Sequence, residues 1–234
     1  MKSEYLCTVK SFRMLTPTVF EIAFETDKNL VFEGGQFVSI IIPGAGPKGR
    51  DLRRAYSIAS APEARPYELC VKLVENGPGT QYLYRLRPHD TFRVLAPYGD
   101  FTYRPQTDQH ICFIATGTGI APFRAIAMSK KFQDNLPNSA ICLFGVRTES
   151  ELLYQKPEEG FQNLKLMNAV SQPSDSWQGF RGRVTHYLQS LGDEYPWLKT
   201  QFYLCGNGEM IQEVKAFLAE KNIEKSKIHQ EKYY

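Results

Sequence analysis

The sequence lacks any long apolar run: none of its 234 residues belong to a stretch of the roughly 18–20 apolar residues that a membrane helix needs. Its N-terminus has no basic segment followed by an apolar one, as a secretory signal would require. The five cysteines are odd in number and widely spread, so no pair has the spacing of a metal site or an iron–sulfur loop. We therefore expect a cytoplasmic protein with no membrane segment and no bound metal.

Strong charge and hydrolytic clusters are missing as well. The formal net charge is only +3, far from the footprint of a nucleic-acid-binding protein, so we expect no nucleic-acid partner. None of the four histidines forms a Ser/His/Asp arrangement, and no paired carboxylates stand out. Hydrophobic residues make up 42% and charged residues 23%, which is ordinary for a globular chain that can bury a core without disulfides.

The first hundred residues read as short strands punctuated by glycine and proline. Examples are residues 6–14, 19–24, 36–42, 55–59 and 67–74, and one short helix follows Pro78-Gly79. Many short strands of this kind predict an antiparallel β-barrel. The polar stretch from Arg104 to His110 marks a linker, so we expect a first domain at residues 1–105.

Strands and helices alternate after that linker. Apolar runs at 111–115, 140–146, 164–170 and 201–205 read as strands, and residues 120–132, 149–159, 184–191 and 209–221 read as helices. This alternation predicts an α/β fold with a doubly wound parallel sheet over residues 106–234.

Two motifs in the first domain suit a phosphate and a flat ring. Arg54 and Tyr56 are two apart on one strand, so they share a face, and Ser57 points to the other. A guanidinium fork suits phosphate, and a phenol ring can cover a heterocycle. Gly77-Pro78-Gly79-Thr80 opens a helix, and a glycine-rich helix start favours anions. An exposed strand and a simple turn are the alternative interpretations.

Two further motifs lie at strand-to-helix junctions of the second domain. Thr116-Gly117-Thr118-Gly119 leads into Ile120-Ala121-Pro122, where a dinucleotide pyrophosphate would bind at the end of a parallel strand. It is not a P-loop, because no Gly-Lys-Ser/Thr follows. Cys205-Gly206-Asn207-Gly208 has the same placement, and Cys205 would face the crevice unless it is a core thiol.

Taken in order, five segments make the whole chain resemble the ferredoxin–NADP reductase family. They are Arg54-x-Tyr56-Ser57, Cys70-Val71-Lys72 with the glycine loop ending in Thr80, Pro97-Tyr98-Gly99-Asp100-Phe101, Gly117-Thr118-Gly119-Ile120-Ala121-Pro122 and Cys205-Gly206-x-x-x-Met210. The resemblance implies an oxidoreductase with FAD as cofactor and NADPH or NADH as substrate. It would pass hydride between the two and single electrons to a separate carrier.

The resemblance also assigns roles to single residues. Its catalytic group would be Ser57, Cys205, Glu231 and Tyr233. FAD would contact Arg54, Ala55, Tyr56, Ser57, Val71, Lys72, Gly77, Gly79 and Thr80. The nicotinamide nucleotide would contact Thr116, Gly117, Thr118, Gly119, Pro122, Arg147, Ser171, Arg183, Cys205, Gly206 and Met210. A C-terminal Glu-x-aromatic unit would cover the flavin with Tyr233, although Tyr234 could do so instead.

Several alternatives stay open. NADPH-preferring members of the family commonly carry a serine–arginine pair where this chain reads Ser171-Gln172, yet Arg147, Arg181 and Arg183 lie in the same region. The acceptor would be ferredoxin, flavodoxin or another one-electron protein, and the basic residues from Lys48 to Arg54 would suit an acidic partner. An oxygenase reductase component, an NAD(P)H:flavin reductase and a redox-sensing binding module are the rival functions. We expect a monomer.

Overall fold

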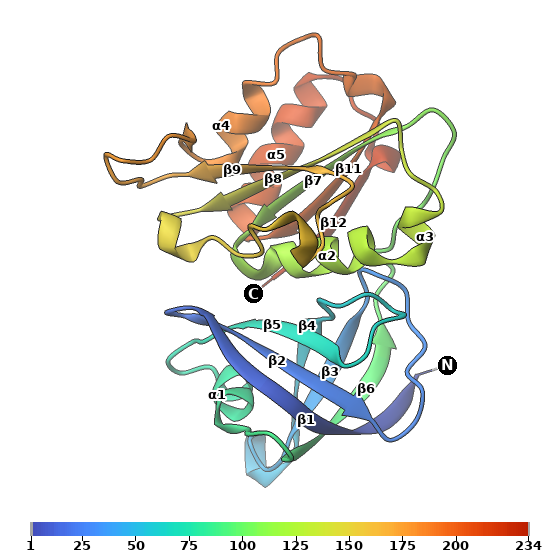
Figure 1. Ribbon diagram of the computed structural model, residues 1–234, viewed down its shortest axis with the longest axis vertical. Coiled ribbons are helices and arrows are strands. Elements are labelled where there is room, and N and C mark those ends of the chain that lie inside the picture. Colours follow the sequence, from blue (N-terminus) through green and yellow to red (C-terminus); the bar gives the residue numbers. More distant parts are fainter. Residues whose placement is uncertain (1, 234) are drawn as a thin grey trace.

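The computed structural model describes residues 2–233, which form two modules, one stacked on the other (Figure 1). The first, here the barrel module, is a sheet of six strands in the order β4-β3-β6-β1-β2-β5, and every neighbouring pair is antiparallel. Its elements are β1 (Ser3–Thr16), β2 (Val19–Thr26), β3 (Phe37–Ile42), the 3-10 turn η1 (Pro47–Gly49), β4 (Leu52–Ser57), β5 (Tyr67–Lys72), α1 (Pro78–Arg85) and β6 (Thr91–Tyr98).

The sheet closes on itself just past the end of β4. Ile58 forms an antiparallel bridge with Leu69 of β5, which joins the two outer strands of the sheet. The enclosed core contains Phe20, Ile22 and Phe24, the alternate residues of β2 that share one face of the strand. Burying each such side chain contributes roughly 1.5–3 kcal/mol. The predicted antiparallel β-barrel is confirmed.

The second module, here the parallel module, is a parallel sheet in the order β10-β9-β8-β7-β11-β12. Its strands are β7 (His110–Thr116), β8 (Ser139–Val146), β9 (Lys165–Val170), β10 (Phe180–Arg181), β11 (Thr200–Gly206) and β12 (Ile228–Lys232). Its helices are α2 (Ala121–Met128), α3 (Lys130–Gln133), α4 (Val184–Gln189) and α5 (Gly208–Glu220). Five 3-10 turns complete it: η2 (Gly117–Ile120), η3 (Glu149–Glu151), η4 (Pro157–Glu159), η5 (Trp197–Lys199) and η6 (Lys225–Lys227).

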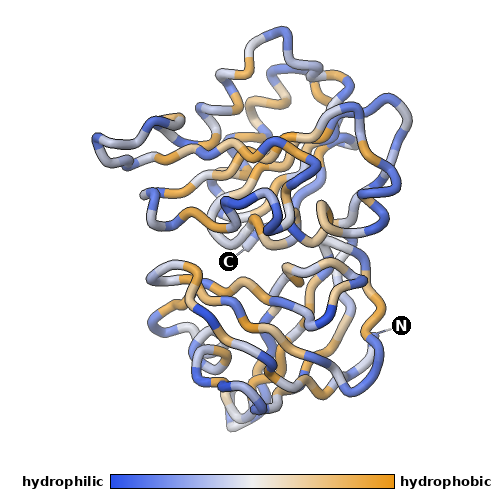
Figure 2. Tube along the Cα trace, in the orientation of Figure 1, coloured by the Kyte–Doolittle hydropathy of each residue, from blue (hydrophilic) through white to orange (hydrophobic). Residues whose placement is uncertain are grey.

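Helices cover both faces of the parallel sheet, as predicted for a doubly wound fold. Helices α2 and α3 lie on the face toward the barrel, and α4 and α5 lie on the other (Figure 1). In Figure 2, hydrophobic residues follow the central strands between these layers. Among residues 2–233, no helix is both long and apolar enough to cross a membrane.

Two predicted helices differ in the structure. Residues 149–159 form two 3-10 turns instead of a helix, because Tyr154 adopts a left-handed φ of 52° and its side chain is buried toward the barrel module. The predicted helix at 120–132 is split at Ser129, which has extended backbone angles. The Ser129 hydroxyl accepts a hydrogen bond from the N–H of Phe132 and so caps α3.

One hydrophobic cluster spans both modules. Val19, Cys70 and Phe101 from the barrel side pack in the same buried cluster as Phe123 and Ile126 of α2. The segment between β6 and β7 covers residues 99–109, and the domain boundary that we predict between residues 105 and 106 lies within it. That boundary stays a prediction, because a shared core offers no gap at which to draw it.

Candidate active site

The last strand of the chain carries two side chains onto the barrel module. β12 pairs in parallel with β11, with Glu231 opposite Cys205, and the N–H of Tyr233 donates to the carbonyl oxygen of Gly206 at 3.1 Å. Glu231 and Tyr233 are two residues apart, so their side chains leave the chain on the same side. Both reach Ser57, the last residue of β4.

Ser57 is the centre of this contact. The Tyr233 hydroxyl donates to Ser57 Oγ at 2.6 Å, and Ser57 Oγ donates to Glu231 Oε2 at 3.1 Å. Cys205 lies against the Tyr233 side chain and is fully buried. The fold therefore brings the four residues predicted as the catalytic group together at the junction of the modules. Two of them, Ser57 and Glu231, are 174 positions apart in the sequence.

Burial dominates the electrostatics of this cluster. It raises the pKa of Glu231 from 4.5 to about 7, while the hydrogen bond from Ser57 opposes the rise. Burial, with the nearby Glu231 carboxyl, also raises the pKa of the Cys205 thiol well above its usual value. Near neutral pH the carboxyl group can thus hold or release a proton, whereas the thiol keeps its own.

A second cluster forms where β4 meets the start of α1. A Cβ added to Gly79 would overlap the Tyr56 hydroxyl and lie 3.0 Å from Arg54 Cγ, so only glycine lets these side chains approach the helix. Within residues 2–233 no side chain caps this helix start, which begins after Gly77. Free N–H groups beside an arginine fit a pyrophosphate.

The side chains of the remaining residues predicted to contact FAD do not point to this cluster as clearly. The Thr80 hydroxyl donates to the carbonyl oxygen of Gly77 at 3.1 Å, so it stabilises the turn. The N–H of Thr80 belongs to the first turn of α1, where helix N–H groups lack an intrahelical partner. The Val71 side chain lies in the barrel core, so only its main chain could reach a ligand. Lys72 and Ala55 are exposed.

The loops after β7 and β11 lie side by side at the switch point of the parallel sheet, where connections leave toward opposite faces. A Cβ on Gly119 would overlap the carbonyl oxygen of Cys205. Gly206 has a φ of 132° and packs on Thr116, whose hydroxyl accepts from the N–H of Asn207 at 2.9 Å. The space beside Gly117 is open: no described atom would lie within 4 Å of a Cβ there.

Thr118, Pro122 and Met210 flank these loops. Thr118 lies in the turn η2 between the two glycines, and Pro122 is buried in the first turn of α2. The Met210 side chain packs in the core on the opposite face of the sheet, only 3% exposed. A contact of Met210 with a nucleotide would therefore have to come from its main chain.

The residues considered for the 2′-phosphate gather at the ends of β8 and β9. The N–H of Gln172 donates to the carbonyl oxygen of Arg147 at 2.7 Å, which joins the two strand ends. Arg183 is paired with Glu213 at 2.9 Å, and Arg181 is held by carbonyl oxygens of its own loop. Among these arginines, Arg147 makes no side-chain ion pair within residues 2–233. Ser171 is exposed beside it.

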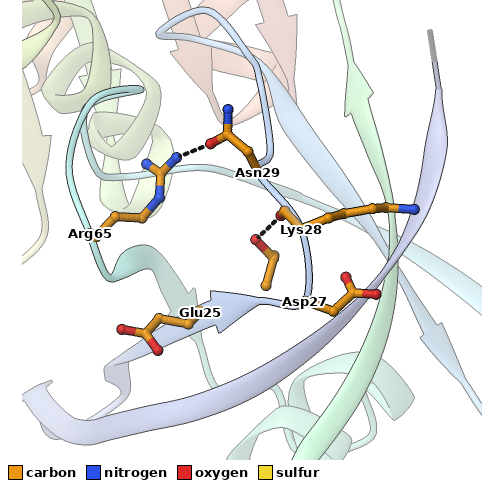
Figure 3. Close-up of a pocket in the computed structure, with 6 residues that line it drawn as sticks. Glu25, Asp27, Lys28, Asn29 and Arg65 are labelled. Carbon is orange, nitrogen blue, oxygen red and sulfur yellow. Dashed lines mark hydrogen bonds between the residues drawn. The ribbon is translucent and has the colours of Figure 1, made fainter.

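The pocket at the end of β2 has no feature of a catalytic or nucleotide-binding site. It has a volume of about 320 Å³ and is lined by Glu25, Thr26, Asp27, Lys28, Asn29 and Arg65. Figure 3 shows these residues. Its arginine donates to Asn29 at 2.6 Å and lies over the Tyr67 ring at 4.0 Å, so it fixes a loop.

Tyr234, the alternative aromatic residue, lies outside the described residues. Sequence analysis assigned no role to Arg124 or Glu68, which join the modules at 2.5 Å.

Comparison with known proteins agrees with both modules. Residues 7–103 match the oxidoreductase FAD-binding domain, and residues 113–216 match the oxidoreductase NAD-binding domain. Ferredoxin–NADP reductase B of Sorangium cellulosum is 33% identical, with 94% of each chain covered. The phenol hydroxylase P5 protein of Acinetobacter pittii is 28% identical, and the match covers 98% of this chain but 65% of that protein. A ferredoxin NADP+ reductase structure from Neisseria gonorrhoeae, with bound FAD and NADP, has a TM-score of 0.84 at 21% identity, with 100% and 99% coverage.

Proposed function

The chain belongs to the ferredoxin–NADP reductase family of flavin oxidoreductases, and from this premise we propose that Ser57, Cys205, Glu231 and Tyr233 form the point where hydride passes between nicotinamide and flavin. The protein is an FAD-dependent oxidoreductase that uses NAD(P)H. One observation carries the proposal for the site. The hydroxyl of Tyr233 and the carboxylate of Glu231 converge on Ser57 from the other module, at 2.6 and 3.1 Å.

The barrel module would hold FAD with the residues gathered at α1. Arg54 and the N–H groups at Gly79 and Thr80 suit its pyrophosphate, and the half-buried Tyr56 ring suits one face of its ring system. When bound, FAD takes up two electrons as hydride and can release them singly. In this arrangement Ser57 Oγ and the Glu231 carboxyl would accept the proton that is released when electrons leave singly, and would return it when electrons enter singly.

The parallel module would hold the dinucleotide across the crevice between β7 and β11. The main chain of Gly117–Gly119 would bind its pyrophosphate, and Cys205 and Gly206 would flank the nicotinamide. The Tyr233 ring would have to leave Ser57 for the nicotinamide to enter, which makes it a gate. A buried, protonated Cys205 excludes water from that place without adding charge.

We propose that the acceptor is a separate acidic one-electron protein, such as ferredoxin or flavodoxin. Lys48 and Arg50 are exposed and make no ion pair within residues 2–233. A K48E/R50E variant should reduce ferredoxin about tenfold more slowly at low salt, since exposed charges steer association. Charge reversal at the exposed Lys215 of α5 controls for a loss of positive charge elsewhere on the surface. Equal rates for all three proteins would exclude this docking surface.

A reductase component of an oxygenase is the second candidate. The anthranilate 1,2-dioxygenase electron transfer component of Acinetobacter baylyi is 32% identical over 88% of this chain, and the match covers 59% of that protein.

The glycine loop at Gly77–Thr80 favours tightly held FAD over use of free flavin. We further propose a cytoplasmic location, because all five cysteines are buried free thiols, as a reducing compartment would keep them. A monomer stays our proposal for the oligomeric state.

An anaerobic absorbance titration with NADPH and, separately, with NADH tests the proposed function. We expect a yellow protein whose flavin band bleaches, faster with the preferred nucleotide. The E231Q variant should bleach more slowly while keeping its FAD, because it replaces the carboxyl group that accepts the hydrogen bond from Ser57. Flavin that neither nucleotide reduces would overturn the proposal.

A further inference from the structure

Arg124 lies in the first turn of α2 and reaches across the junction of the modules. Its Nη1 donates to Glu68 Oε2 at 2.5 Å and to the carbonyl oxygen of Ala59 at 2.9 Å, both in the barrel module. Its Nε donates to the carbonyl oxygen of Glu159 at 2.5 Å, and its plane lies over the Tyr154 ring at 4.5 Å. The side chain is only 7% exposed, so these contacts are shielded from solvent.

A second buried contact crosses the junction next to the first. The Tyr154 hydroxyl donates to Glu21 Oε2 at 3.1 Å, and Glu21 is itself paired with Arg13 at 2.7 Å. Because the Tyr154 ring also supports the Arg124 guanidinium, the two cross-module contacts form one polar network. Such a network has defined directions, unlike the apolar packing around it.

Helix α2 connects the Arg124 contacts directly to the nucleotide loop. The turn at Gly117–Ile120 runs straight into α2 and lies against β5, the strand that carries Glu68. At the next residue of α2, a Cβ on Gly34 of the barrel module would lie 2.7 Å from the carbonyl oxygen of Ala125. The middle of the helix therefore touches the barrel, and Arg124 makes its directional contact there.

We propose that Arg124 is a positioning residue for hydride transfer: through α2 it sets the place of the nucleotide loop relative to Ser57 and Tyr56. The inference rests on the proposed function. Hydride transfer needs its two reacting atoms within a narrow range of distance and direction, and a misplacement of about 1 Å can cost on the order of a hundredfold in rate. Arg124 contributes by holding one module in register with the other, without touching the reacting atoms.

The choice of variants follows from burial. Removing Arg124 alone would leave Glu68 unpaired and largely buried, which destabilises the fold. The R124M/E68Q double variant removes both charges, and R124K keeps the charge but loses the planar fork and its several acceptors. Lys131 of α3 pairs with Glu33 of the barrel module at 2.6 Å, with side chains 43% and 53% exposed, so K131M is a matched cross-module control.

The test measures flavin reduction per bound FAD after rapid mixing with saturating NADPH or NADH. R124M/E68Q should be reduced at least about tenfold more slowly than wild type, R124K about threefold more slowly, and K131M within about twofold. A second readout is the Kd for NADP+ or NAD+, measured by titration, which should stay within about threefold, because the loop itself is unchanged.

Each outcome decides between the possibilities. An R124M/E68Q protein that is less stable to urea but reduced at the wild-type rate per bound FAD would make Arg124 purely structural and overturn the inference. So would a raised Kd with an unchanged saturated rate. If the double variant does not fold, a wild-type rate in R124K overturns it equally. A wild-type flavin that NADPH and NADH both fail to reduce refutes the proposed function instead.

Discussion

Glu231 should make the flavin-free protein less stable as the pH rises. Burial raises its pKa from 4.5 to about 7 in the folded state. Between these two values the folded protein keeps a proton that the unfolded chain has released, so the free energy of unfolding falls with rising pH across this window. One pKa unit corresponds to about 1.4 kcal/mol, so the whole difference amounts to roughly 3 kcal/mol.

Urea unfolding of wild type, E231Q and E220Q at about pH 5 and about pH 8 measures this effect. Near pH 5 the protonated carboxyl and the amide of E231Q are alike. Near pH 8 the amide avoids a buried charge, so E231Q should gain roughly 2–3 kcal/mol on wild type. Glu220 is exposed on α5, and its variant should follow wild type at both values. A constant gap between wild type and E231Q would refute the assignment of the raised pKa to burial.

Three further predictions concern the nucleotide. Gly119→Ala should weaken NADP+ and NAD+ binding about tenfold, since overlap with the main chain of Cys205 costs ~1–3 kcal/mol; an unchanged Kd in calorimetry would contradict the role of this loop. Tyr233→Ser should tighten nucleotide binding about fivefold, because opening no longer breaks the ~1 kcal/mol hydrogen bond to Ser57; weaker binding would argue against a gate. Arg147→Ala should raise the KM for NADPH about tenfold and barely change that for NADH, as expected for a charged hydrogen bond; equal effects in steady-state assays would place the 2′-phosphate elsewhere.

Local signals in the sequence predicted the short segments in which the backbone is closely approached. Gly119 and Gly206 stood out because glycines at strand-to-helix junctions have few other uses, and the structure has each in close contact with the neighbouring loop. Gly79 likewise lies where Arg54 and Tyr56 need room. The two sheets were predictable because the period of apolar residues changes after the linker at residues 104–110, from strand-like to alternating strand and helix.

Contacts between distant segments could not be predicted in this way. Residues 228–232 are mostly polar and were not predicted as a strand, yet they form β12 because β11 offers an unpaired edge. Arg124 and Glu68 are 56 positions apart, and no motif near either residue predicts that they form an ion pair. The predicted helix at 149–159 was wrong for the same reason, since the left-handed turn at Tyr154 serves a contact with Glu21 in the other module.

Two of the polar connections between the modules, Tyr233 with Ser57 and Arg124 with Glu68, differ in a way that suits their proposed roles. The contact of Tyr233 with Ser57 is partly exposed and follows an edge strand, β12, so it can open at small cost. The contact of Arg124 with Glu68 is buried among several partners, so opening it would leave two buried charges unpaired. An enzyme that must admit a nucleotide without losing its alignment needs one connection that yields and one that does not. Y233S should therefore change nucleotide binding without the fall in saturated rate expected of R124M/E68Q, because the fixed connection remains.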